Sequence, residues 1–173
     1  MVRLTAWLAR APDPVFTLFV IFVSFSTYFC MYAFRKPFSA VSYQGLKFLG
    51  GEVDLKTAFV VSQIIGYVLS KIIGIKVCPE IGRQRRAQGL VLMILLAELS
   101  LLFFAILPNN LKVVAIFFNG LPLGMVWGLV VLYLEGRRTS EMLLAGLSCA
   151  YIVASGAVKD IGLWLMSSFQ VDQ

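Results

Sequence analysis

The stretch VVAIFFNGLPLGMVWGLVVLYL, residues Val113–Leu134, contains no charged side chain and decides the fold class. A helix that crosses a hydrocarbon core of about 30 Å needs about 20 mostly apolar residues, and this stretch meets that requirement. Lipid offers no hydrogen-bond partner to open backbone groups, and alternation at the period of a β-strand is absent. The stretch therefore predicts a transmembrane helix.

Four other stretches have the same apolar character, so the sequence predicts an all-α, polytopic membrane helix bundle with five transmembrane helices. The expected spans are residues 14–34, 57–77, 90–107, 113–134 and 143–166. Apolar and aromatic residues continue beyond the first span, and we expect its helix to extend toward Tyr43. Small residues four apart give the second and the fourth span each a face on which a neighbouring helix can pack closely.

Composition excludes several classes of protein. The chain is 60% hydrophobic and 14% charged, which excludes a disordered chain and disfavours a soluble domain. The three cysteines look like apolar packing residues, because their number is odd and two lie within spans. The chain has no histidine and no nucleotide-binding motif, so we expect no metal, no cofactor and no intramembrane enzyme.

The arginines predict the orientation in the membrane. With the N-terminus inside, seven arginines fall on the inner side and three lysines fall in the outer loops. The arginines are Arg3, Arg10, Arg83, Arg85, Arg86, Arg137 and Arg138, and the lysines are Lys47, Lys56 and Lys112. Because positive residues favour the cytoplasmic side, we expect a cytoplasmic N-terminus. The net charge of +6 then reflects membrane topology, so no nucleic-acid partner is expected.

Charged side chains within the spans are candidates for a functional site, because each costs at least about 2.5–3.5 kcal/mol to place at the bilayer centre. They are Arg35, Lys36, Lys71, Glu98, Lys159 and Asp160. Four are basic and two are acidic, a surplus of positive charge that suits an anion. Arginine offers bidentate hydrogen bonds to phosphate or carboxylate, and lysine offers a point charge.

Lys71 and the Arg35–Lys36 pair each allow two interpretations. Lys71 continues a polar stripe with Gln63 and Tyr67 at four-residue spacing, which indicates a cavity, although its amine can also reach the inner interface. Arg35 and Lys36 either anchor the outer end of the first helix or line a polar pathway. We favour the pathway, because outer basic residues oppose the inside-positive bias.

Glu98 lies about ten residues into its span, hence about 15 Å deep, at the midplane of the membrane. It is either a structural partner or neutral carboxyl, or a site for a proton or counter-charge. Lys159 shares a helix face with Tyr151 and Ser155 and is a candidate for the same cavity as Lys71. Asp160 is better explained by an ion pair or by anchoring at the interface.

Two short motifs resemble a known family of carriers. Tyr32-Ala33-Phe34-Arg35-Lys36-Pro37-Phe38 and Gly66-Tyr67-Val68-Leu69-Ser70-Lys71 are similar to motifs in the first two helices of organophosphate:phosphate antiporters of the major facilitator superfamily. The fourth span, with Gly120, Gly124 and Trp127, resembles the family as well. The segment 134–141 is similar to an uncharacterised bacterial branch near these antiporters. The resemblance implies a substrate site at Arg35 and Lys71, with Lys36 weaker.

The chain departs from this family in two respects. The loop after the second span reads Cys78-Pro79-Glu80-Ile81-Gly82-Arg83, where the family carries an Asp-Arg signature. The family has twelve helices with its site between two halves, whereas five spans are expected here. The resemblance therefore implies that residues 1–173 form an incomplete N-terminal bundle, which needs further helices or a second chain to complete a carrier.

These observations lead to two hypotheses of different classes. The first is a secondary carrier of a small organic or phosphorylated anion that works by alternating access in the bacterial inner membrane. In it, Arg35, Lys36, Tyr67, Lys71 and Lys159 bind or attract the anion and Glu98 balances charge. The alternative is a membrane sensor or scaffold that retains a carrier-like fold without transporting.

Overall fold

A computed structural model describes residues 6–8, 10–135 and 140–169. Its long helices are α2 (Asp13–Arg35), α4 (Leu55–Glu80), α5 (Arg86–Ile106), α6 (Asn109–Leu134) and α7 (Ser140–Phe169). A short helix α3 (Pro37–Ala40) and a 3₁₀ turn η1 (Phe48–Gly50) lie between α2 and α4. The described residues form no β-strand beyond an isolated antiparallel bridge between Lys47 and Asp54.

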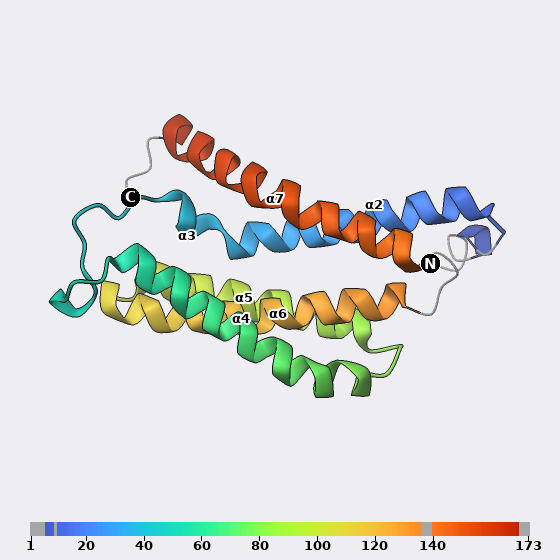
Figure 1. The fold of residues 1–173 in the computed structure, drawn as a ribbon, viewed down its shortest axis with the longest axis horizontal. Helices are drawn as coiled ribbons and strands as arrows, with labels where there is room; N and C mark the ends of the chain where they lie inside the picture. The colour runs from blue at the N-terminus through green and yellow to red at the C-terminus, as the bar shows by residue number, and fades with distance from the viewer. Residues whose placement is uncertain (1–5, 9, 136–139, 170–173) are drawn as a thin grey trace.

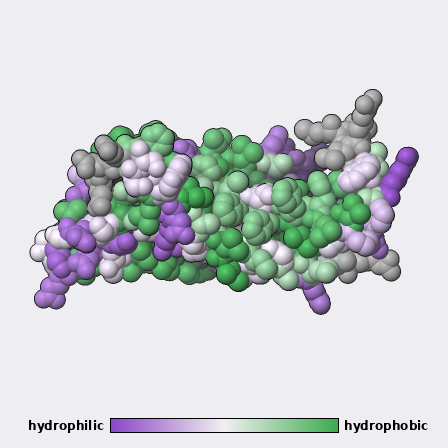
Figure 2. All heavy atoms as spheres, turned by 90° about the horizontal axis from the view of Figure 1, so that it is seen from above, coloured by the Kyte–Doolittle hydropathy of each residue, from purple (hydrophilic) through white to green (hydrophobic). Residues whose placement is uncertain are grey.

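All five long helices among the described residues are long and apolar enough to cross a membrane. The predicted fold class, an all-α bundle of five transmembrane helices, is therefore confirmed, and the chain is an integral membrane protein. Figure 2 shows hydrophobic residues along the middle of the molecule and hydrophilic residues gathered toward its two ends, the distribution that a bilayer requires.

The helices run side by side in two groups (Figure 1). Helices α4 and α5 both pack on α6, and α2 pairs with α7. Successive long helices run in opposite directions, so the α4–α5 connection lies at one end of the bundle and the loops around η1 and before α6 lie at the other. This arrangement separates the described arginines of the predicted inner side from the three lysines of the predicted outer loops. Arg3, Arg137 and Arg138 lie outside the described residues.

The closest approach in the bundle is between α4 and α6. A Cβ atom on Gly66 would lie 2.3 Å from the backbone oxygen of Phe117, and one on Gly120 would lie 2.4 Å from the backbone oxygen of Gln63. Ser62 also donates a hydrogen bond of 2.7 Å to the carbonyl of Val113. The small-residue faces of the second and fourth spans therefore do pack closely, as expected, and the structure shows that they pack on each other, where only glycine leaves room for the opposite backbone.

The predicted extension of the first helix toward Tyr43 is wrong, because α2 ends at Arg35. Lys36 leaves the regular helix with φ −109° and ψ −5°, and Pro37 begins the separate helix α3. Proline has no N–H to donate, its ring clashes with the preceding turn, and it disfavours helical geometry in the residue before it. The chain resumes a single helical turn and then becomes extended at Val41.

Candidate functional site

The break in α2 is held in place by two amide side chains from neighbouring helices. Gln63 of α4 donates a hydrogen bond of 2.9 Å to the carbonyl of Arg35, and a second of 2.9 Å to Oδ1 of Asn119. Asn119 of α6 donates 3.1 Å hydrogen bonds to the carbonyls of Phe34 and Ala97. The amides therefore satisfy carbonyls that lose their regular donors at the break, and they connect α2, α4, α5 and α6 in one network.

The network places Arg35 beside the polar stripe of α4. The guanidinium carbon of Arg35 lies 4.2 Å from the centre of the Tyr67 ring, and the amine of Lys71 lies 5.0 Å from the same ring. The Lys71 amine is also 5.1 Å from the ring of Trp127 on α6. Both cations thus rest on aromatic faces, which attract positive charge through the ring quadrupole.

Tyrosines from α2 and α7 complete an aromatic wall next to the two cations. The hydroxyl groups of Tyr28 and Tyr67 are 3.3 Å apart, within hydrogen-bonding distance. The ring of Tyr28 meets Tyr32 and Tyr151 edge to face at 5.7 and 6.3 Å between centroids. Tyr151 comes from α7, so four of the long helices, α2, α4, α6 and α7, contribute to this region.

The charge of this region is positive. Among the described residues, neither Arg35 nor Lys71 forms an ion pair, and the pair Lys47–Asp54 lies in the loop before α4. The Nε atom of Arg35 is buried and has no hydrogen-bond partner within the part of the chain that the structure describes. An anion is the ligand that such an arrangement can bind, because it can supply an acceptor to the buried Nε of Arg35 and a counter-charge to both cations.

Two other basic residues of the predicted site lie near the C-terminal end of α2. Lys36 lies just beyond the α2 span, where burial together with the charges of Arg35 and Lys159 lowers the pKa of its amine. Lys159 is exposed on α7. The structure therefore brings Arg35 and Lys159 within electrostatic reach of Lys36, while Arg35 and Lys71 both contact the Tyr67 ring.

The acidic residues are not brought to the cations. Glu98 lies on the exposed face of α5 and forms no ion pair with another described residue. Asp160 is exposed on α7 and is likewise without an ion-pair partner in the described ranges. The ion pair or charge balance that we expected from each of these residues is therefore not seen in this structure.

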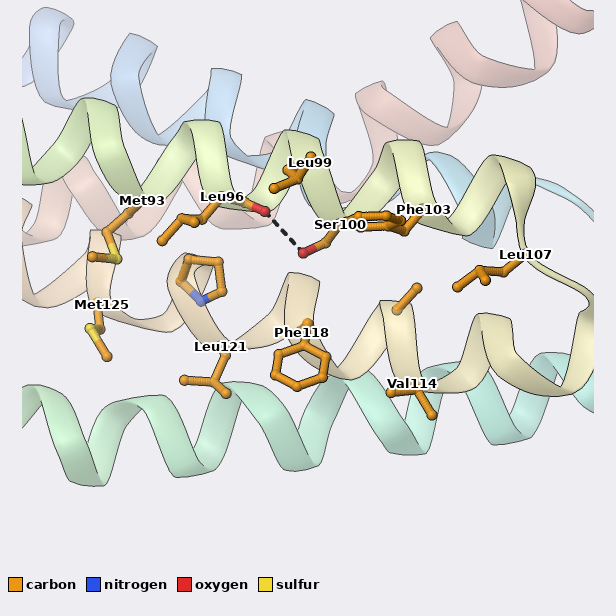
Figure 3. Close-up of a pocket in the computed structure, with 12 residues that line it drawn as sticks. Met93, Leu96, Leu99, Ser100, Phe103, Leu107, Val114, Phe118, Leu121 and Met125 are labelled. Carbon is orange, nitrogen blue, oxygen red and sulfur yellow. Dashed lines mark hydrogen bonds between the residues drawn. The ribbon is translucent and has the colours of Figure 1, made fainter.

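A cavity of about 350 Å³ begins at Lys71 and continues between α4 and α6 toward the end of the bundle that carries the arginines. The two helices diverge there, and Gly74, Cys78, Trp127 and Glu135 are among the lining residues. A larger cavity of about 460 Å³ lies between α5 and α6 (Figure 3), but its lining is apolar except for Ser100. That hydroxyl donates to the carbonyl of Leu96 in its own helix. Of these two cavities, the smaller one therefore offers a ligand the contact with a charged side chain, that of Lys71.

The loop that replaces the Asp-Arg signature of the carriers forms a different contact. Glu80 and Arg83 are exposed, and no ion pair joins them. Instead Arg86, at the start of α5, donates a hydrogen bond of 2.8 Å to the carbonyl of Leu132 near the end of α6. This hydrogen bond satisfies a carbonyl of the last helical turn with a cation, the arrangement that the helix dipole favours.

Sequence reasoning missed Asn119 as a member of this region. The signal that points to it is a single amide side chain in an otherwise apolar span, since a buried amide requires partners.

Of possible metal ligands, no group of three or more cysteine, aspartate or glutamate residues lies together in the described parts of the chain.

The fold and this cationic region define a polytopic helical membrane protein with a candidate anion site. Residues 37–173 match DUF5690, a family of unknown function, and the chain therefore belongs to this family. The matched range includes Tyr67, Lys71, Glu98 and Lys159, whereas Arg35 and Lys36 precede it. No curated protein and no solved structure matches the chain.

Proposed function

We propose that the chain is the front part of a secondary carrier for a small organic or phosphorylated anion. In this proposal it works by alternating access in the bacterial inner membrane, with its N-terminus on the cytoplasmic side. Arg35 and Lys71 bind the anion, Tyr67 holds the two cations apart, and Lys36 and Lys159 add to the positive field. Further helices or a second chain complete the carrier.

The observation that carries the proposal is the position of Arg35 and Lys71 at the same Tyr67 ring without a described carboxylate beside them. Arg35 is half-buried and Lys71 is exposed on α4, and unpaired cations within membrane-spanning helices are costly unless they serve a ligand or a pathway. Arginine can hold two oxygens of a phosphate or carboxylate at once, and the lysine can neutralise a second charge.

The pairing of the helices also supports a carrier. In a half-carrier made of two inverted three-helix repeats, the first helix corresponds to the fourth and the second to the fifth. A contact between the first and fifth helices then implies an equivalent contact between the fourth and second. The bundle contains both contacts, α2 with α7 and α6 with α4.

Anion binding can be measured by the fluorescence of Trp127, whose ring is 5.1 Å from the Lys71 amine. In a protein in which Trp7 and Trp164 are replaced by phenylalanine, titration with inorganic phosphate and with an organic monophosphate should change the emission saturably. Arg35→Ala and Lys71→Ala should each weaken binding by about 10-fold or more, since a hydrogen bond to a charged group contributes about 1.5–3 kcal/mol.

Lys76→Ala is the matched control, because Lys76 is an exposed lysine on the same helix as Lys71 and is not one of the proposed site residues. Equal affinities in all three variants would contradict the site assignment.

Exchange of labelled phosphate in vesicles that contain the complete protein then separates the two hypotheses. Binding together with exchange supports a carrier, whereas binding without exchange favours the sensor or scaffold.

A further inference from the structure

Glu98 is a carboxyl group on a helix surface where lipid is the expected neighbour. It lies in the middle part of the 21-residue helix α5 and on its exposed side. No ion pair joins it to another described residue. A lone carboxyl at this depth is costly in hydrocarbon, and such residues almost always contact protein or water. The position of Glu98 therefore indicates that this face of α5 contacts a partner.

The face has the spacing of a helix–helix seam. Gln88, Val91, Leu95, Glu98, Leu102 and Ala105 follow one another at alternating intervals of three and four residues, and all are exposed. Val91, Leu95 and Leu102, with 60, 59 and 59% of their surface exposed, are more open than Leu99 and Phe103, with 46% each. A repeat of this kind, maintained along a helix, is typical of a left-handed pair of helices.

This α5 seam is distinct from the face that α5 turns toward α6. Leu96, Leu99 and Phe103 line the apolar groove between α5 and α6 (Figure 3), beside the seam. The groove contains only the satisfied hydroxyl of Ser100 as a polar group. Among the described residues, this groove therefore offers Glu98 no free hydrogen-bond donor, and a partner that contacts the seam can supply one.

We propose that the α5 seam is the contact between two copies of this chain. Two copies inserted in the same direction are related by a two-fold axis along the membrane normal, so their α5 helices are parallel and in register. Each seam residue then meets its own equivalent, and Glu98 lies at the same depth as the partner's Glu98. A protonated carboxyl donates a hydrogen bond to a second carboxyl or carboxylate, and the Gln88 amide both donates and accepts. Both polar residues of the seam are thus self-complementary.

Oxidative cross-linking of single cysteines in membranes tests this interface. Cys30, Cys78 and Cys149 are first replaced by serine, and one cysteine is introduced as Leu95→Cys or Leu102→Cys. The controls are Leu99→Cys and Phe103→Cys, which are exposed on the same helix outside the seam. We expect at least fivefold more covalent dimer at positions 95 and 102 than at positions 99 and 103.

Glu98 is then changed in the Leu95→Cys background. Glu98→Leu should weaken dimerisation by about 3- to 20-fold, the range that hydrogen bonds between helices in a bilayer contribute, whereas Glu98→Gln should retain it. Equal cross-linking at all four positions, or none at any, would overturn the proposal and indicate lipid or a different helix on this face. The comparison of the four positions is made with Glu98 unchanged, so it holds even if Glu98→Leu fails to fold.

Discussion

Replacing Asn119 with leucine should destabilise the bundle more than any exposed substitution of the same kind. The Asn119 side chain is completely buried, and its amide makes three hydrogen bonds, with Gln63, Phe34 and Ala97. A hydrogen bond between helices in a bilayer contributes about 0.6 kcal/mol on average and up to about 1.7 kcal/mol. Since leucine has a similar size but no polar atom, Asn119→Leu should lower the free energy of unfolding by about 2–5 kcal/mol.

The free energy of unfolding can be measured by titrating the protein in mixed micelles with a denaturing detergent while following its helical circular dichroism. Asn109→Leu is the control, because Asn109 is exposed at the start of α6 and should change stability by at most about 0.5 kcal/mol. If Asn119→Leu cost no more than this control, the amide network would not hold α2 to the rest of the bundle.

Three other predictions concern the helix contact, the outer loop and the site. Gly120→Ala should destabilise the protein by about 2 kcal/mol or more, because the added Cβ would lie 2.4 Å from the backbone oxygen of Gln63. Gly156→Ala is the control in the same titration: a Cβ at Gly156 would have no neighbouring atom within 4 Å, so this change should raise stability by about 0.5–1 kcal/mol. Burial raises the pKa of Tyr43 to about 12, above the value of about 10 in the unfolded chain. The stability that its neutral form contributes is therefore complete below about pH 10 and lost as the pH rises toward 12, and Tyr43→Phe should remove this part of the alkaline loss when unfolding is measured across that range. Arg35→Lys should keep the charge but weaken phosphate binding by about 10-fold in the Trp127 titration, since lysine lacks the bidentate geometry; unchanged affinity would mean that charge alone binds the anion.

The spans could be predicted from the sequence because apolar length is the physical requirement for crossing a bilayer. The predicted span 57–77 compares with α4 at Leu55–Glu80, which is longer because residues 55–56 and 78–80 are helical as well. The sequence predicts too long a first helix because the residues after Pro37 are apolar, whereas the backbone restriction that proline imposes ends α2 at Arg35.

The candidate site could be predicted only in part. The spacing of Gln63, Tyr67 and Lys71 already indicated one face of a helix, but their contact with Arg35 depends on how α2 packs against α4. The exposed position of Glu98 could not be derived, because α5 is apolar around most of its circumference and its sequence does not distinguish the side that packs on α6. Asn119 was missed because only the fold shows which carbonyls its amide can reach.

The central claim is that Arg35 and Lys71 face a water-filled chamber that accepts an anion. In a variant without native cysteines, Arg35→Cys and Lys71→Cys are treated separately with a charged, water-soluble thiol reagent. Ile72→Cys serves as the control, since Ile72 is exposed on a neighbouring face of α4. The account predicts that the cysteines at positions 35 and 71 react, that inorganic phosphate slows their reaction, and that the cysteine at position 72 does not react. If both site cysteines were as unreactive as the one at position 72, the side chains would face lipid and the account would be contradicted.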